Sequence, residues 1–280
     1  MKYRSFSTTG WKTSEIGLGC WAIGSEWGEV SPKDAREVLR ASLDNGVNFF
    51  DTADVYGDGR SEKFVGELIK STSEKIFVAT KTGRRLNPHN AEGYNLKNIE
   101  KFIDRSLINL GVECIDLIQL HCPPSEICPK KETYEMLDEL VKIGKIANYG
   151  VSVEKVSEAM DAIQFKNVKS IQIIFNIFRQ KPAEKFFKEA AKSEVAIIAR
   201  VPLASGLLTG KMSSESKFPK NDHRNYNIKG EAFDVGETFS GVDFEKGLEA
   251  VQRLKALTPE NYSLADLALK WILMHDEVSE

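Results

Sequence analysis

The sequence of 280 residues lacks several features that mark whole classes of protein. Lys and Arg number 38 against 41 Asp and Glu, so no surplus of positive charge is available for nucleic acid or an anionic membrane. No apolar run approaches the roughly 18 residues of a membrane span, and the opening residues contain no signal-peptide run. We therefore predict a cytoplasmic globular protein that acts on a small molecule and binds neither nucleic acid nor membrane.

Cysteine and histidine are also sparse, at four residues each. The cysteines form no CxxC pair and are too few to cross-link a chain of this length, so we expect reduced thiols at Cys20, Cys114, Cys122 and Cys128. No HxH or HExxH spacing indicates a metal site. His89 and His223 fall in polar stretches that predict loops, so we expect surface or packing roles for them.

What the sequence does contain is a regular alternation of short β-rich runs and amphipathic segments. Several runs are nearly continuous in Ile, Val, Leu and Phe, as in parallel strands buried on both faces. Seven such runs without a break in composition favour one (β/α)8 TIM barrel domain over residues 1–280 rather than an open doubly wound sheet. The predicted strands are Ile16–Cys20, Val47–Thr52, Ile76–Lys81, Ile115–His121, Ala147–Val153, Ser170–Asn176 and Val195–Leu203.

Helix signals occupy the intervening segments. Ser31 and Pro32 predict the start of a helix that ends before Gly46, and Asn95 and Gly111 bracket another in the same way. The opening stretch YRSFSTTGWKTSEIG predicts an N-terminal β-hairpin that closes the bottom of the barrel.

Four polar residues fall where a barrel places its chemistry, at the carboxyl ends of strands. Asp51, Lys81 and His121 end three predicted strands, and Tyr56 lies in the loop after the first of them. A tyrosine of pKa near 10 is a usable acid at neutral pH when a nearby cation lowers that pKa, and a carboxylate keeps a buried lysine charged. We predict that Lys81 and Asp51 tune Tyr56 as a proton donor, while His121 orients a carbonyl oxygen.

Each of these residues taken alone has an ordinary structural interpretation, as a helix cap, a packing side chain or a solvated charge. Asp54 and Asp58 lie beside glycines in a sequence typical of turns, and we assign them no catalytic role.

Motifs along essentially the whole chain resemble those of the aldo-keto reductases. They are GLGCW, FFDTADVYGDGRSE, VATK, CIDLIQLH, GKIANYGVS and PLASGLLTGK, in that order. The resemblance implies a barrel that binds NADPH without a Rossmann domain and reduces aldehydes or ketones, and the lack of a GxGxxG motif agrees. It also implies that Tyr56 is the general acid of hydride transfer, assisted by Asp51, Lys81 and His121.

The same resemblance implies a cofactor site. Its polar groups for the nicotinamide carboxamide match Ser152 and Gln172, and its diphosphate loop matches the run from Leu203 to Lys211. The full set of expected cofactor-binding residues is Cys20, Trp21, Ser152, Gln172, Arg200, Val201, Pro202, Leu203, Ser205, Gly206 and Lys211.

Three departures from the family pattern bear on the cofactor. Arg200 stands where many members place an aromatic ring under the nicotinamide, and its charge would favour the reduced cofactor. Val153 stands where an asparagine is common. The chain ends at Glu280, where the family continues into an eighth strand, a segment that grips the 2′-phosphate and a last helix. We expect a barrel incomplete at its carboxyl end, with NADH as an open alternative to NADPH.

Two other functions remain open at this point. Some members of the family are cofactor-binding subunits of larger assemblies, such as potassium-channel β subunits, and a barrel with Asp51 and His121 could also be a metal-dependent hydrolase. The substrate and the oligomeric state are not legible from the residues, although Trp21 and Trp27 could line an apolar pocket beside Tyr56.

Overall fold

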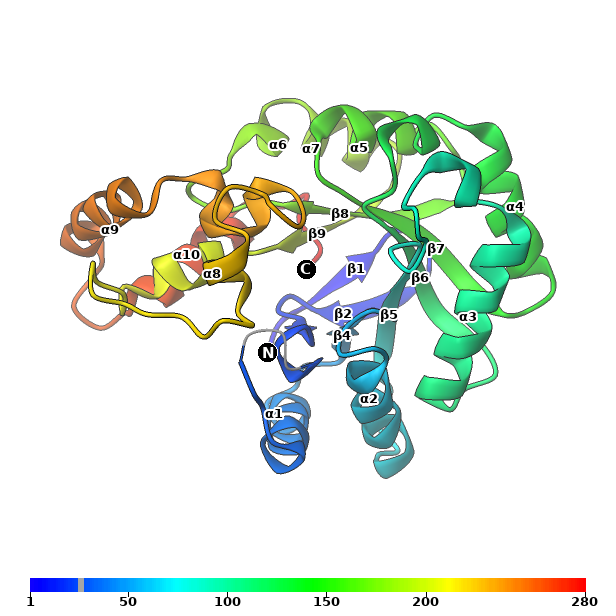
Figure 1. Ribbon diagram of the computed structural model, residues 1–280, viewed down its shortest axis with the longest axis horizontal. Helices are drawn as coiled ribbons and strands as arrows, with labels where there is room; N and C mark the ends of the chain where they lie inside the picture. The colour runs from blue at the N-terminus through cyan, green and yellow to red at the C-terminus, as the bar shows by residue number, and fades with distance from the viewer. Residues whose placement is uncertain (25–27) are drawn as a thin grey trace.

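In the computed structural model, which describes residues 1–24 and 28–280, parallel strands form one curved sheet around a central space (Figure 1). Each strand pairs with the next along the chain, in the order β3 to β9, so every predicted run contributes a strand and the predicted barrel architecture is confirmed. The strands are β3 (Leu18–Gly19), β4 (Phe49–Asp51), β5 (Phe77–Thr82), β6 (Ile115–His121), β7 (Ile146–Val153), β8 (Val168–Ile174) and β9 (Ala196–Arg200).

Helices cover the outer face of this sheet (Figure 1). The predicted caps are present: the Ser31 hydroxyl accepts a hydrogen bond from the Asp34 amide at 3.1 Å, and Gly111 ends its helix at φ +67°. The helices along β4 to β9 are α1 (Pro32–Asp44), α2 (Arg60–Ser71), α3 (Leu96–Leu110), α4 (Lys131–Lys142), α5 (Val156–Ala162), α6 (Lys181–Glu184) and α7 (Phe186–Lys192).

The core has two layers, one on each face of the sheet. All six residues of β5 are buried, as expected of a strand with apolar cover on both sides. The larger layer lies between sheet and helices, and the smaller one fills the bottom of the barrel. The hairpin of β1 (Tyr3–Phe6) and β2 (Trp11–Ser14) contributes Phe6 to the smaller layer, where its ring stacks on Phe49 at 5.4 Å. The predicted hairpin therefore closes the bottom of the barrel.

The last three residues of the chain pair with β9. Val278 forms an isolated parallel bridge with Ile197, and the Ala199 amide donates to the Glu280 carbonyl at 2.9 Å. Arg4 of the hairpin also holds this end, because its guanidinium donates to the Leu273 carbonyl at 2.7 Å. We expected the eighth strand to be missing, but residues 278–280 pair with β9 at the position where such a strand would begin.

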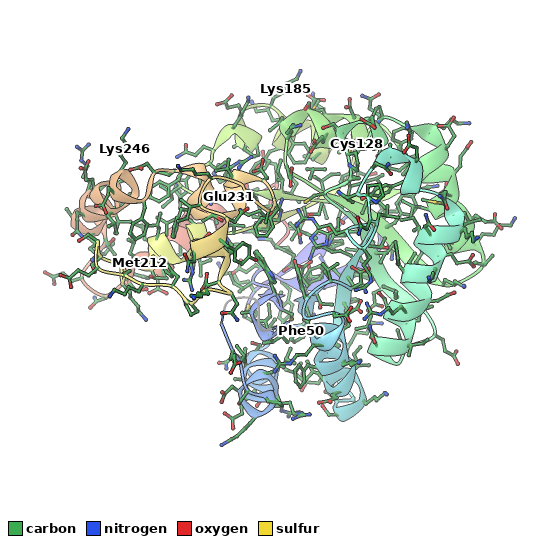
Figure 2. The ribbon with its side chains drawn as sticks, in the orientation of Figure 1. Phe50, Cys128, Lys185, Met212, Glu231 and Lys246 are labelled. Carbon is green, nitrogen blue, oxygen red and sulfur yellow. The ribbon has the colours of Figure 1, made fainter. Side chains whose placement is uncertain are left out.

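A second, smaller core lies beside the barrel, around the segment that follows β9. Figure 2 shows Met212, Glu231 and Lys246 on this part of the molecule, apart from Phe50 and Cys128 of the barrel. Its apolar side chains include Leu207, Phe239 and Leu264. It is built from 3-10 turns and helices, namely η4 (Ala204–Thr209), α8 (His223–Tyr226), η5 (Val235–Glu237), η6 (Phe239–Gly241), α9 (Phe244–Leu257) and α10 (Leu264–Leu273). In the described part of the chain, every helix is too short or too polar to cross a bilayer.

Candidate active site

A cleft of about 520 Å³ opens at the carboxyl ends of the parallel strands. Asp51, Tyr56 and His121 all line it, each at or just after the end of a strand. Lys81 lies beneath the surface of the cleft with 1% of its side chain exposed. The structure therefore brings together the four residues that the sequence predicted to meet.

Lys81 is the centre of this group. Its ammonium forms an ion pair with the Asp51 carboxylate and donates to the Thr52 carbonyl at 2.9 Å. The Tyr56 hydroxyl lies 3.4 Å from the same nitrogen. A cation is thus held between the carboxylate and the phenol, which is the arrangement that the sequence predicted.

The second oxygen of Asp51 extends the polar network across the cleft. It accepts hydrogen bonds from the side-chain amides of Gln119 at 3.2 Å and Gln172 at 2.9 Å. Gln172 in turn accepts from the Ser152 hydroxyl at 3.2 Å. Of the two residues expected to hold a carboxamide, Gln172 is therefore positioned by the Asp51 carboxylate, and Ser152 is positioned through Gln172.

Burial controls the protonation of the two groups that face the cleft. It raises the pKa of Tyr56 well above its usual value, with Asp51 and Glu237 adding to the effect, so the expected lowering of this pKa by Lys81 is wrong for the protein without substrate. Burial also holds the pKa of His121 well below its usual value, assisted by Arg84, Lys81 and Arg200. Tyr56 keeps its proton and His121 is neutral at neutral pH.

The two rings also contact one another. The Tyr56 and His121 rings meet edge to face at 5.9 Å, and the Trp21 ring stacks against Tyr56 at 5.8 Å. The Nδ1 atom of His121 is buried without a hydrogen-bond partner among the described residues. A neutral imidazole carries one N–H donor, so His121 can donate one hydrogen bond into the cleft.

The residues expected to bind the cofactor lie mainly along the β9 side of the cleft. Trp21, Ser152 and Gln172 line it, together with the predicted residues Arg200, Val201, Pro202, Leu203, Ser205 and Gly206. This lining suits an extended dinucleotide, because it offers polar side chains and a run of backbone amides. It also includes a buried Arg200 Nε that has no hydrogen-bond partner among the described residues. The residues present therefore fit NAD(P)H.

Two of the residues expected to bind the cofactor, Cys20 and Lys211, are not among those that line this cleft. Cys20 is buried beneath it, where burial raises the pKa of its thiol, and Lys211 is exposed away from it. Trp27 lies outside the described residues. The Ser205 hydroxyl, although its residue lines the cleft, donates to the Glu237 carbonyl at 2.8 Å, so its side chain serves the fold.

Arg200 is paired, which changes its expected effect. Its guanidinium forms an ion pair with Glu237 and donates to the Val153 carbonyl at 3.0 Å. Burial acts to lower the pKa of Arg200, but Glu237 and other neighbours outweigh it and raise the pKa above its ordinary value. Because the carboxylate offsets the charge, the proposed bias of Arg200 toward the reduced cofactor is weaker than the sequence suggested.

The sequence did not predict several residues that lie in or beneath the cleft. Gln119 lies two positions before His121 on the same face of β6, so the two-residue period of a strand could have found it. Arg84 lies two residues after the end of β5, but Glu237 and Arg224 come from the irregular segment after β9, where no periodicity indicates direction. His223, expected in a polar loop, is buried and stacks on Trp21 at 4.9 Å, so its role is packing.

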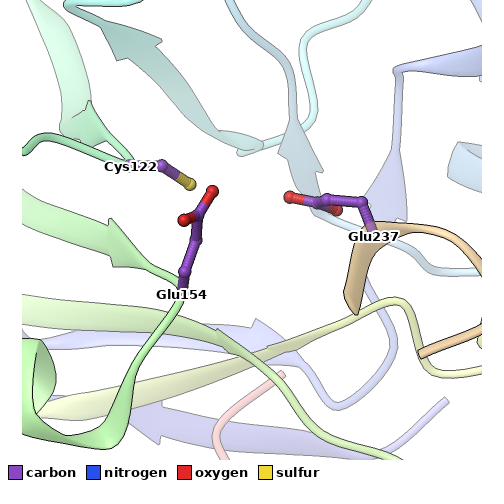
Figure 3. Close-up of side chains that lie close together, drawn as sticks. All are labelled: Cys122, Glu154 and Glu237. Carbon is purple, nitrogen blue, oxygen red and sulfur yellow. The ribbon is translucent and has the colours of Figure 1, made fainter. Parts of the chain in front are cut away.

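Cys122, Glu154 and Glu237 point toward one another at the rim of the cleft, with their ligand atoms within 4.8 Å (Figure 3). Arg84 pairs with Glu154 at 3.3 Å, and Arg200 pairs with Glu237. Both carboxylates therefore already have cationic partners, and we assign no metal to this cluster.

Comparison with known proteins agrees with the fold. The model of the Aldo/keto reductase family matches residues 15–279, which is nearly the whole chain. This chain therefore belongs to the aldo-keto reductase family.

Individual relatives are similar over most of their length. The aldo-keto reductase YhdN of Bacillus subtilis (strain 168) is 36% identical over 98% of this chain and 81% of its own length. The aldo-keto reductase yakc [NADP(+)] of Schizosaccharomyces pombe is 31% identical over 92% of this chain and 76% of its own length. The solved structure of the glycerol dehydrogenase AKR11B4 of Gluconobacter oxydans superposes with a TM-score of 0.79. It is 30% identical, and the match covers 99% of this chain and 84% of that one.

Proposed function

We propose that this chain is an NADPH-dependent reductase of aldehydes or ketones, acting as one barrel domain over residues 1–280. The observation that carries the proposal is the position of Lys81, whose buried ammonium contacts both the Asp51 carboxylate and the Tyr56 hydroxyl. The name of the fission-yeast relative, which includes NADP(+), supports the choice of cofactor. The free state of all four cysteines is compatible with a cytoplasmic location.

The residues divide the chemistry among them. NADPH, when bound, supplies a hydride to the carbonyl carbon. Tyr56 donates its proton to the carbonyl oxygen, and Lys81 stabilises the tyrosinate that develops as the proton leaves. Asp51 keeps Lys81 charged, while the neutral His121 donates a hydrogen bond that orients the oxygen. The product is an alcohol, and solvent returns the proton to Tyr56.

Binding of the cofactor depends on the other side of the cleft. Ser152 and Gln172 are placed to hold the carboxamide, and the loop from Val201 to Gly206 is placed to surround the diphosphate with backbone amides. Arg224 lines the same end of the cleft and pairs with Asp222 at 2.6 Å. These contacts support an extended nucleotide along β9.

The test is steady-state oxidation of NADPH and NADH by the purified chain with a panel of simple aldehydes and ketones. We expect turnover that requires the carbonyl compound and is faster with NADPH at equal concentration. Stoichiometric NADPH binding without turnover of any carbonyl would instead favour the alternative function, a cofactor-binding subunit of a larger assembly. Absence of both binding and turnover would overturn the proposal.

A further inference from the structure

We propose that Arg84 selects carbonyl substrates that carry a carboxylate, by binding that carboxylate beside Tyr56 and His121. This inference rests on the proposed reductase function and names its substrate class. Arg84 lies two residues after the end of β5 and lines the same cleft as Tyr56 and His121. No motif in the sequence assigned it a role.

Arg84 is the least compensated of the cations at this cleft. Lys81 and Arg200 are each in close ion pairs, and their side chains are 1% and 13% exposed. Arg84 is 22% exposed, and one nitrogen meets Glu154 at 3.3 Å. Its remaining nitrogens have no hydrogen-bond partner in the part of the chain that the structure describes. It therefore has donors to offer a ligand.

The position of Arg84 leaves room for such a ligand. A second cavity of about 560 Å³ adjoins the cleft, and Arg84 lines both. Pro123 and Pro124, which follow His121 and Cys122, line this cavity together with Phe233. A substrate whose carbonyl contacts Tyr56 can extend past Arg84 into this space, away from the β9 loop that suits the cofactor.

The surroundings of Arg84 suit recognition of a planar anion. Its guanidinium carbon lies 5.8 Å from the centre of the Phe233 ring, which restricts the orientation of the group. A guanidinium can meet a carboxylate with two parallel hydrogen bonds. The charge of Arg84 also acts on His121. Burial is the main cause of the low pKa of His121, and Arg84 lowers that pKa further, with Lys81 and Arg200.

Glu154 competes with an anionic substrate for the Arg84 guanidinium, so a change at Glu154 distinguishes a binding role of Arg84 from a structural one. Its side chain is 25% exposed and pairs with Arg84 through a single contact. Removing the carboxylate of Glu154 should free Arg84 and strengthen binding of an anionic substrate. A purely structural ion pair predicts the opposite, since breaking it would only loosen the rim of the cleft.

The experiment compares 3- and 4-carboxybenzaldehyde with the corresponding carbamoylbenzaldehydes, which are neutral and nearly isosteric. We expect kcat/KM for at least one acid to exceed that for its amide by about 10-fold or more. Arg84→Gln should reduce this preference to near unity, Arg84→Lys should restore part of it, and Glu154→Gln should increase it. Arg40→Gln is the control for net charge, because Arg40 pairs with Asp44 on α1.

Binding of the matched alcohols, followed by intrinsic tryptophan fluorescence, gives a second readout that needs no turnover. We expect Arg84→Gln to weaken binding of 3- or 4-carboxybenzyl alcohol by about 10-fold and leave the carbamoyl alcohols unchanged. Turnover of the amides without any preference for the acids would overturn this inference alone. Failure of every aldehyde to react would overturn the proposed function, and the binding data would still decide whether Arg84 holds a carboxylate.

Discussion

The two walls of the cleft are built in different ways. One, which we name the strand wall, consists of Asp51, Lys81 and His121 on β4 to β6 with Tyr56 on the loop between them. Backbone hydrogen bonds hold these strands in parallel register, such as Asp51 opposite Ala79. The other, the turn wall, consists of residues 201–206 and 235–241, where short 3-10 turns replace strands.

The backbone of the turn wall is strained, and side chains hold it. Val201, Ser205 and Ser240 have φ of +56°, +55° and +59°, a region that costs a non-glycine residue about 1 kcal/mol or more. The buried Asn176 amide donates to the Val201 carbonyl at 2.9 Å and to the Ser240 hydroxyl at 2.7 Å. The strand wall therefore depends on a repeating ladder, and the turn wall depends on a few buried polar groups.

The largest effect should come from the acid in the strand wall. Tyr56→Phe removes the hydroxyl that we propose as the proton donor, and we expect carbonyl reduction to fall by about 100-fold to 10,000-fold. NADPH affinity should stay within a few-fold, because the hydroxyl is proposed to act on the substrate oxygen, and the proposed cofactor contacts are Ser152, Gln172 and the turn wall. Single-turnover rates and fluorescence titration of NADPH separate the two, and full activity of the variant would falsify the assignment of Tyr56.

Loss of the cation beside Tyr56 should also slow carbonyl reduction, but by less than loss of the Tyr56 hydroxyl. Lys81→Met leaves Tyr56 its proton, since burial already raises the pKa of that group, but removes the charge that stabilises the developing tyrosinate. We expect a fall of roughly 100-fold in kcat and a decrease in thermal stability, because Asp51 loses its partner. Lys81→Arg controls for charge, and a kcat unchanged in the Met variant would contradict the assignment.

A change in the turn wall should affect binding rather than chemistry. Asn176→Ala removes two buried hydrogen bonds, worth about 1 kcal/mol each, that hold Val201 and Ser240. We expect NADPH to bind about 10-fold more weakly while kcat at saturating cofactor changes by less than about 3-fold.

Asn148→Ala is the matched control for that prediction. Asn148 lies on β7 and donates to the Asp116 carbonyl at 3.2 Å, so the same substitution removes a hydrogen bond within the sheet. Isothermal titration with NADPH should distinguish the two variants. Equal dissociation constants for both would show that Asn176 does not hold the cofactor loop.

This difference between the walls also explains what the sequence could predict. Asp51, Lys81 and His121 end runs of buried β-branched and aromatic residues, and the barrel then fixes their meeting place. Glu237 lies 37 positions after its partner Arg200, in a segment without periodicity, so no local pattern indicated the pair. The raised pKa of Tyr56 could not be predicted either, because it follows from the burial of the hydroxyl in the folded cleft, which outweighs the effect of Arg84 and Arg200.

The last expected effect is on stability rather than on activity, and it concerns the one loop in the strand wall, which carries Asp54 as well as Tyr56. Asp54 is fully buried, and Arg85 and Arg105 donate to its backbone carbonyl at 3.3 and 3.4 Å. Burial, with a contribution from Glu62, raises the pKa of the Asp54 carboxyl from 3.8 to about 7, while the two arginines act in the other direction. The carboxyl is therefore largely protonated in the folded chain below pH 7.

The sign of the stability change follows from this shift. In the unfolded chain Asp54 ionises above pH 3.8, so the raised folded pKa costs stability progressively from about pH 4 to about pH 7, and the full cost remains above pH 7. Each unit of pKa difference corresponds to roughly 1.4 kcal/mol. Asp54→Asn removes the titration, and we expect its melting temperature to exceed that of the parent at pH 8 and to approach it near pH 4. Melting curves between pH 4 and 8 check this, with Asp276→Asn as the exposed control. An Asp54→Asn variant whose advantage does not grow with pH would show that Asp54 does not titrate in this range.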